Sequence, residues 1–125
     1  MGRLSKPTDA ELAILTVLWE RGPSTVRQVH EALAGTRETG YTTTLKLMQI
    51  MADKGLVTRN EAARTHVYSA IAGEAQTQQQ LLRDLVDRAF GGSAAALVLR
   101  ALSADDTSES ELREIRKLID EHREK

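Results

Sequence analysis

Apolar residues recur at intervals of three and four positions in the first third of the chain, which is the spacing of helices that bury one face. The first run follows a capping-box pattern, Thr8 to Glu11, and ends where Gly22 and Pro23 interrupt it. The second run begins with a similar box, Thr25 to Gln28, and ends near Gly35. We therefore expect two short helices, one after each box.

The third run, Thr42 to Lys54, is as regular along its polar face as along its apolar face. The face expected to be buried contains Thr44, Leu47, Met48 and Met51. The opposite face contains Thr42, Lys46, Gln49 and Asp53. Hydroxyl, ammonium and amide groups can hydrogen-bond phosphates and base edges in the major groove of DNA. This pattern predicts a DNA recognition helix.

Beyond the third run the period shortens to two residues, which indicates a β-hairpin. The expected strands are residues 56–59 and 65–69, joined by a loop that contains no glycine. Arg59 and Arg64 would lie at or near the tip of this hairpin, where a wing meets phosphates or the minor groove. Three helices followed by such a hairpin predict a winged helix-turn-helix DNA-binding domain over residues 1–72.

From residue 73 onward the pattern is helical again and indicates no further strand. Two or three short amphipathic helices are expected, with apolar positions at Leu81, Leu85, Phe90, Leu97, Leu99, Leu102, Leu112, Ile115, Leu118 and Ile119. Such helices have little to pack against within one chain, so we expect residues 73–125 to form a helical dimerisation domain. A small intramolecular bundle behind the wing is the alternative. The expected fold class is mostly α with a small β-hairpin wing.

The composition limits the chemistry open to the chain. Its 125 residues include no cysteine, which excludes disulfides and thiolate metal sites and fits a reducing cytosol. No apolar run approaches the roughly 20 residues that a membrane span requires, and the N-terminus lacks a signal-peptide pattern. The sequence also lacks an HExxH motif, a phosphate-binding glycine loop and a dinucleotide fingerprint. We expect a soluble, cytoplasmic protein that is not an enzyme and uses no metal or cofactor.

The formal net charge of −1 is unevenly distributed. Residues 1–70 carry a net charge of +2 and residues 71–125 a net charge of −3. A local basic face would suit a DNA-binding protein, but an ordinary mixed surface explains the same excess. A winged helix that binds another protein, and no specific DNA, is therefore the alternative function.

Residue types and positions suggest how DNA would be contacted. Phosphate or minor-groove contacts are expected from Arg59, Arg64, Lys54, Thr25, Thr42 and Thr43. Thr25 would offer its hydroxyl and a free backbone amide at the start of the second helix, and Thr42 and Thr43 would do the same for the third. Lys54 would equally be favoured by the dipole at a helix C-terminus.

Base contacts are expected from Thr43, Lys46 and Gln49. Lysine suits guanine O6 and N7, glutamine suits adenine N6 and N7, and a threonine methyl suits the thymine methyl. One good contact discriminates between bases by about 1–3 kcal/mol, so three would make a monomer weakly selective. A homodimer on a palindromic operator would supply the missing specificity.

Many short segments, in this order and spacing, resemble the penicillinase repressor family, the BlaI/MecI type that includes the copper-responsive CopY repressors. They are Leu12 to Trp19, Gly22, Thr25-Val26, Val29, Tyr41 to Thr44, Leu47-Met48, Lys54 to Val57, Arg64 to Tyr68, Phe90 to Ser93, Ala96 to Leu99 and Ser110 to Leu112. The resemblance implies a dimer with an N-terminal winged helix and C-terminal dimerisation helices. It also implies repression from a palindromic operator, often with TACA and TGTA half-sites.

Three features of the sequence depart from what the resemblance implies. In resistance regulators of the family, a membrane sensor protease triggers cleavage between Asn and Phe in a segment similar to Leu97 to Ala101, where this chain has Arg100-Ala101. The resemblance thus suggests a regulatory protease as a partner, but the pair Arg100-Ala101 argues against it. Many relatives have Arg in place of Ile50 and a small residue in place of Lys46, so the reading face is rearranged. Copper sensing through C-terminal cysteines is excluded because there are none.

Overall fold

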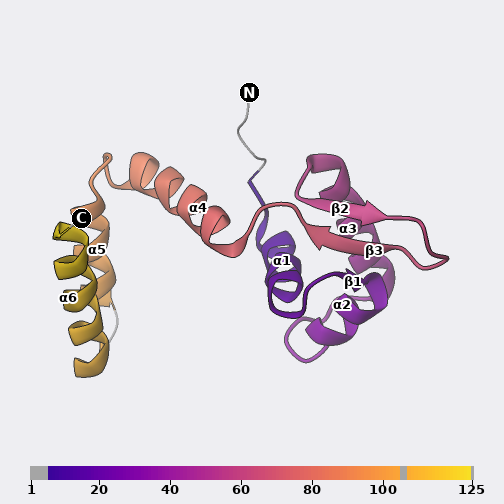
Figure 1. The fold of residues 1–125 in the computed structure, drawn as a ribbon, viewed down its shortest axis with the longest axis horizontal. Helices are drawn as coiled ribbons and strands as arrows, with labels where there is room; N and C mark the ends of the chain where they lie inside the picture. Colours follow the sequence, from indigo (N-terminus) through magenta and orange to yellow (C-terminus); the bar gives the residue numbers. More distant parts are fainter. Residues whose placement is uncertain (1–5, 105–106, 125) are drawn as a thin grey trace. The chain divides into compact units, whose positions relative to one another are not determined.

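The computed structural model describes residues 6–104 and 107–124, which divide into two compact units, one ending at Leu81 and the other beginning at Leu82. The first unit contains α1 (Asp9–Arg21), β1 (Ser24–Thr25), α2 (Val26–Leu33), α3 (Tyr41–Lys54), β2 (Val57–Asn60), β3 (Val67–Ala70) and the start of α4 (Glu74–Ala89) (Figure 1). The second contains the rest of α4, α5 (Ala94–Ala104) and α6 (Glu109–Arg123). The expected domain boundary at residue 73 stays a prediction.

The helices of the first unit begin and end where local sequence signals place them. Thr8 and Glu11 form the expected capping box, in which the Thr8 amide donates to Glu11 Oε1 over 2.9 Å and the Glu11 amide donates to Thr8 Oγ1 over 3.2 Å. The Thr25–Gln28 box is present at the start of α2. α3 ends at Gly55, whose φ of 81° is left-handed and favours glycine. The Leu56 amide then donates to the Met51 carbonyl and closes the helix end.

A three-stranded antiparallel sheet of order β1-β3-β2 completes the winged helix. β2 and β3 lie side by side as a hairpin (Figure 1). The expectation that the second strand begins at residue 65 was wrong, because pairing starts with Asn60 opposite Val67 and leaves Thr65 and His66 in the loop. β1 was not predicted from the sequence, because its two residues are too few to show a period. The predicted fold class, mostly α with a small hairpin wing, is confirmed.

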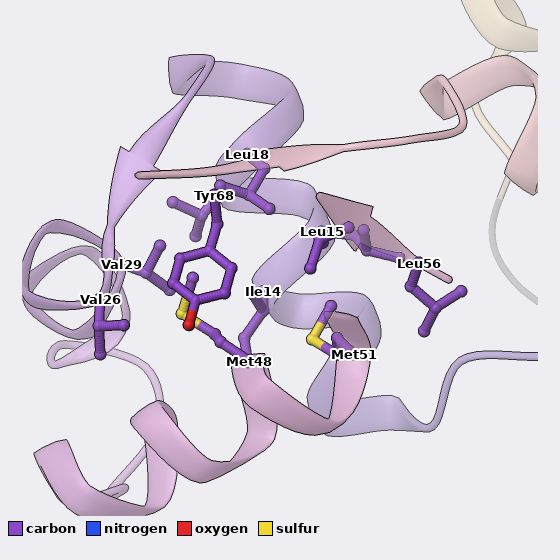
Figure 2. Packing of buried hydrophobic residues seen from close by; sticks show 11 residues of the cluster. Ile14, Leu15, Leu18, Val26, Val29, Met48, Met51, Leu56 and Tyr68 are labelled. Atoms are coloured by element: carbon purple, nitrogen blue, oxygen red, sulfur yellow. The ribbon is translucent and has the colours of Figure 1, made fainter. Parts of the chain in front are cut away.

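The core of the first unit is built from all three helices and the sheet. Figure 2 shows the ring of Tyr68, from β3, among side chains of α1, α2 and α3, including Ile14, Val29 and Met48. These four side chains are almost completely buried. The apolar face of α3 is therefore fixed against the core, and this fixes which residues of α3 face solvent.

The second unit also begins its helices with local caps. Gly91 and Gly92 have positive φ and separate α4 from α5. The Ser93 hydroxyl accepts from the Ala96 amide over 3.1 Å, and the Ser108 hydroxyl accepts from the Glu111 amide over 3.1 Å. Within one chain, α4, α5 and α6 each leave large apolar side chains exposed.

Candidate nucleic-acid interface

The solvent-facing side of α3 carries the residues expected to read DNA. Its exposed residues include Thr42, Thr43, Lys46, Gln49, Ile50 and Asp53. Thr44, Met48 and Met51 lie on the opposite side and are buried. The amphipathic pattern read from the sequence is thus present, and a helix with one free polar face is the geometry that major-groove insertion needs.

The start of α3 is open to a ligand. Gly40 precedes the helix and provides no side-chain cap. The first intrahelical bond joins the Thr44 amide to the Gly40 carbonyl over 3.1 Å. The amides of the first turn, which include those of Thr42 and Thr43, are the ones that a helix leaves without an internal partner. Together with the positive end of the helix dipole, they form a phosphate-binding arrangement.

A groove of about 540 Å³ lies between the start of α2, the middle of α3 and the loop of the wing. Its lining residues are Thr25, Val26, Arg27, Tyr41, Leu45, Gln49, Arg59, Arg64, Thr65, His66 and Tyr68. Four expected DNA contacts meet here, Thr25, Gln49, Arg59 and Arg64, although they are separated by up to about 40 residues in the sequence. Thr42, Thr43 and Lys46 do not line the groove but belong to the adjoining face of α3.

Arg27 is a groove residue that the sequence analysis missed. Its guanidinium carbon lies 5.7 Å from the centre of the Tyr41 ring, a cation–π arrangement. The His30 ring meets the same tyrosine edge-on, with 5.9 Å between ring centres. The sequence did contain a signal for Arg27, which lies in the first turn of α2. The helix dipole disfavours a positive charge there, so an anionic partner is expected to compensate. Thr65 and His66 also line the groove and were not expected there, because they were assigned to a strand and belong to the loop.

The wing arginines differ in their surroundings. Arg59 Nε lies 2.7 Å from Glu61 Oε2, and its guanidinium also shares a hydrogen bond with Tyr68. The hydrogen bonds with Tyr68 and Glu61 raise the pKa of Arg59 above its ordinary value. Arg64 is exposed and forms no salt bridge within the described part of the chain. Arg64 is thus free to neutralise a phosphate, whereas Arg59 would first have to release Glu61.

Lys54 has an internal partner that the sequence analysis did not foresee. Its Nζ lies 2.7 Å from Oε1 of Glu11, whose side chain is almost completely buried. Burial raises the pKa of Glu11, but the hydrogen bonds from Lys54 and Thr8, with the positive charge of Lys54, outweigh burial and hold this pKa below its ordinary value. The structure therefore ties Lys54 to α1, and we leave it out of the proposed DNA contacts.

Thr25 is also engaged differently from the expectation. Its amide, expected to be free, donates to Gln28 Oε1 over 2.9 Å, and its hydroxyl oxygen accepts from the Gln28 amide over 3.2 Å. The capping box thus uses the amide that a phosphate would need. Only the hydroxyl hydrogen of Thr25 remains for DNA.

The residues expected to mediate dimerisation are incompletely covered in a single chain. Leu85, Leu99, Leu112, Leu118 and Ile119 are exposed, as are Leu82 and Val98 beside them. Leu81, Phe90, Leu97, Leu102 and Ile115 are half-buried. In contrast, Val86 is buried. Large apolar side chains clustered on solvent-exposed helices are typical of a surface that another chain covers.

Comparison with known proteins identifies the family. Residues 7–121 match the model of the penicillinase repressor family. The chain belongs to this family. It is 39% identical over 101 residues to the transcriptional regulator BlaI of Mycobacterium tuberculosis, an alignment that spans 78% of this chain and 73% of that protein. It is 23% identical over 123 residues to the penicillinase repressor of Bacillus licheniformis, spanning 98% of this chain and 96% of that protein.

A solved structure has a similar fold. It is the monomeric form of Bacillus licheniformis BlaI in complex with the blaP half-operator, which matches with a TM-score of 0.52 at 23% identity and covers 60% of this chain and 92% of that one. The family is one of transcriptional repressors, and the chain is not an enzyme. None of the helices in residues 6–104 and 107–124 has the length and apolar character needed to cross a bilayer.

Proposed function

We propose that this penicillinase-repressor family member represses transcription by binding an inverted-repeat operator as a homodimer. The observation that carries the proposal is the free polar face of α3 beside a groove that contains Arg27, Arg59 and Arg64. The relative from Bacillus licheniformis, which has a similar fold, was solved bound to a half-operator. A protein-binding adaptor would not need three guanidinium groups around one groove.

In this proposal α3 enters the major groove. Thr43, Lys46 and Gln49 contact base edges, because all three are exposed on the face that points away from the core. The amide and hydroxyl of Thr42 bind a phosphate at the start of α3, and the hydroxyl of Thr25 binds another. Arg27 and Arg64, which form no salt bridge within the described residues, neutralise phosphates and release counterions, which makes binding dependent on salt.

The second unit supplies the other half of the specificity. Its exposed leucines, with Val98 and Ile119, would be covered by the same residues of a second copy, which gives a two-fold symmetric dimer. Two copies of α3 would then meet half-sites about one helical turn, or a multiple of it, apart. Arg100 and Ala101 lie inside α5, where a backbone held in helical hydrogen bonds is a poor protease substrate. We therefore propose an inducing signal other than cleavage at this pair.

Fluorescence anisotropy tests the proposal. The full chain is titrated into labelled duplex DNA from upstream of its own gene and into a scrambled duplex, at two salt concentrations. Tight, salt-sensitive binding to the upstream duplex alone is the expected result. Lys46→Ala should lower affinity for that duplex roughly tenfold or more, since one good base contact discriminates by about 1–3 kcal/mol.

Arg64→Ala separates a phosphate contact from a base contact. It should weaken binding to both duplexes alike and reduce the slope of log affinity against log salt by about 0.9 per lost phosphate contact. Arg21→Ala is the matched control, because Arg21 is an exposed arginine at the end of α1 outside the groove. Equal, weak binding of the wild type to both duplexes would instead favour the adaptor.

A further inference from the structure

Ile50 interrupts the polar face of α3. It is 39% exposed, although it lies in the middle of the helix and not at an end where packing is loose. Its neighbours on the exposed side are Lys46, Gln49 and Asp53. The core side of the same helix is already filled by Met48 and Met51, which are completely buried.

Helix formation does not explain this residue, because a β-branched side chain is a poorer helix former than lysine, glutamine or alanine. Burial explains it only in part, since 39% of the residue stays exposed to water. A single apolar side chain among charged and amide groups is also much smaller than the apolar patches that mark protein–protein contact sites. The position instead lies where the proposed function brings α3 against the bases.

The helical spacing places Ile50 beside the proposed base contacts. It follows Lys46 by four residues and Thr43 by seven, so the three side chains form one stripe along α3. Four residues advance a helix by roughly 6 Å, and one base pair advances B-DNA by roughly 3.4 Å. The group that Ile50 contacts therefore lies within about two base pairs of the base that Lys46 contacts.

We propose that Ile50 is a specificity-determining residue that reads the C5-methyl group of a thymine in the operator major groove. That methyl is the apolar group on the major-groove edge of the natural base pairs, where the remaining groups are hydrogen-bond donors and acceptors. The inference rests on the proposed function and adds to it a base contact made by burial of apolar surface. It predicts that the affinity for operator DNA depends on a thymine methyl group, and not only on hydrogen bonds to base edges.

Replacing thymine by deoxyuridine tests this directly, because it removes the methyl and leaves every hydrogen-bonding group of the base in place. In each half-site of the duplex that the wild type prefers, thymines are replaced one position at a time. Replacement at one of these positions should raise the Kd roughly fourfold, which is the effect of losing one buried carbon. The same replacement in both half-sites should raise the Kd roughly fifteenfold. The thymine whose replacement raises the Kd should lie within about two base pairs of the base pair that Lys46 recognises. That base pair is the one that the Lys46→Ala variant no longer distinguishes from others.

Variants of the protein assign that effect to Ile50. Ile50→Ala should bind the thymine and uracil duplexes equally, whereas Ile50→Val should keep part of the difference. Ile71→Ala is the matched control, since Ile71 is an exposed isoleucine of the same unit outside α3, and it should retain the full difference.

The outcomes separate the two proposals. If the wild type prefers its operator but no thymine-to-uracil change alters its Kd, or if Ile50→Ala retains the difference, the inference about Ile50 is overturned and the repressor proposal stands. If the wild type prefers no duplex, the repressor proposal itself fails.

Discussion

The ion pair between Glu11 and Lys54 joins the start of α1 to the end of α3, and replacing Lys54 by methionine tests its contribution. Glu11 Oε1 accepts hydrogen bonds from Lys54 Nζ over 2.7 Å and from the Thr8 amide over 2.9 Å. The Glu11 side chain is 3% exposed and that of Lys54 is 28% exposed. Methionine keeps most of the apolar stem and removes the ammonium. A buried carboxylate is then left without its cation.

The expected cost at neutral pH is about 2 kcal/mol of unfolding free energy. Breaking a fully buried pair costs about 3–5 kcal/mol, and exposed pairs contribute about 0–1 kcal/mol. This pair is intermediate, because Glu11 is buried but keeps its bond from Thr8, while Lys54 is partly hydrated. With a urea dependence of about 2 kcal/mol/M, the unfolding midpoint should fall by about 1 M.

The pH dependence is the sharper test, because its sign should reverse. In the wild type the pKa of Glu11 is held below its ordinary value, so the pair stabilises the fold fully above the unfolded pKa. That contribution is lost as the pH falls through the lowered folded pKa. Without Lys54, burial, the largest single influence on the pKa of Glu11, is opposed only by the hydrogen bonds from Thr8, so we expect this pKa to rise above its unfolded value. The protonated carboxyl then suits the buried site better, so the Glu11 contribution becomes more favourable as the pH falls from neutral.

Urea titrations followed by the fluorescence of Trp19 measure this effect in the first unit. Trp19 is the single tryptophan and donates to the Ala72 carbonyl over 3.0 Å, so its emission reports on that unit. The double variant Lys54→Met/Glu11→Gln removes the titrating group, and its difference from Lys54→Met isolates Glu11. Stability curves of the wild type and Lys54→Met that decline in parallel on acidification would refute the reasoning.

Two further predictions concern the end of α3 and the second unit. Gly55→Ala should cost about 1 kcal/mol, because Gly55 has a φ of 81° and a side chain there is strained even though no atom lies within 4 Å of it. Urea unfolding should show this loss and show none for Gly35→Ala, where the backbone has no positive φ. Leu99→Lys should shift the full chain from dimer to monomer in analytical ultracentrifugation, because it places a charge on the surface proposed to be covered. Ile71→Lys, at an exposed apolar position in the first unit, should leave the dimer intact, and a monomeric wild type would contradict the prediction.

Local sequence signals predicted the winged helix well because its elements are specified locally. The two capping boxes, the glycine ends and the amphipathic pattern of α3 involve residues within one or two turns of each other. The hairpin was predicted with small errors in its bounds, since the period of two continues beyond the residues that pair. β1 could not be predicted, because its strand character arises from pairing with Tyr68 and Val67.

Sequence reasoning was weaker wherever a residue acts through a distant partner. Glu11 was expected in the capping box, but its second bond reaches Lys54, 43 residues away. The groove likewise gathers Arg27 and His66 from segments that are separate in sequence. A pattern of spacing shows which face of a helix is polar. It does not show which polar group on that face already has an internal partner.

Internal ion pairing therefore decides what the charges of the first unit can do for DNA binding. Lys54 neutralises Glu11, and Arg59 is paired with Glu61, so a phosphate reaching Arg59 would exchange one anion for another and gain little. Lys46, Arg27 and Arg64 form no salt bridge within the described residues and can each neutralise a phosphate or contact a base without that exchange. The net charge of +2 over residues 1–70 counts the paired and the unpaired cations alike. Affinity for DNA should follow the unpaired cations at the groove and on α3, because only these convert phosphate contact into counterion release without breaking an existing pair.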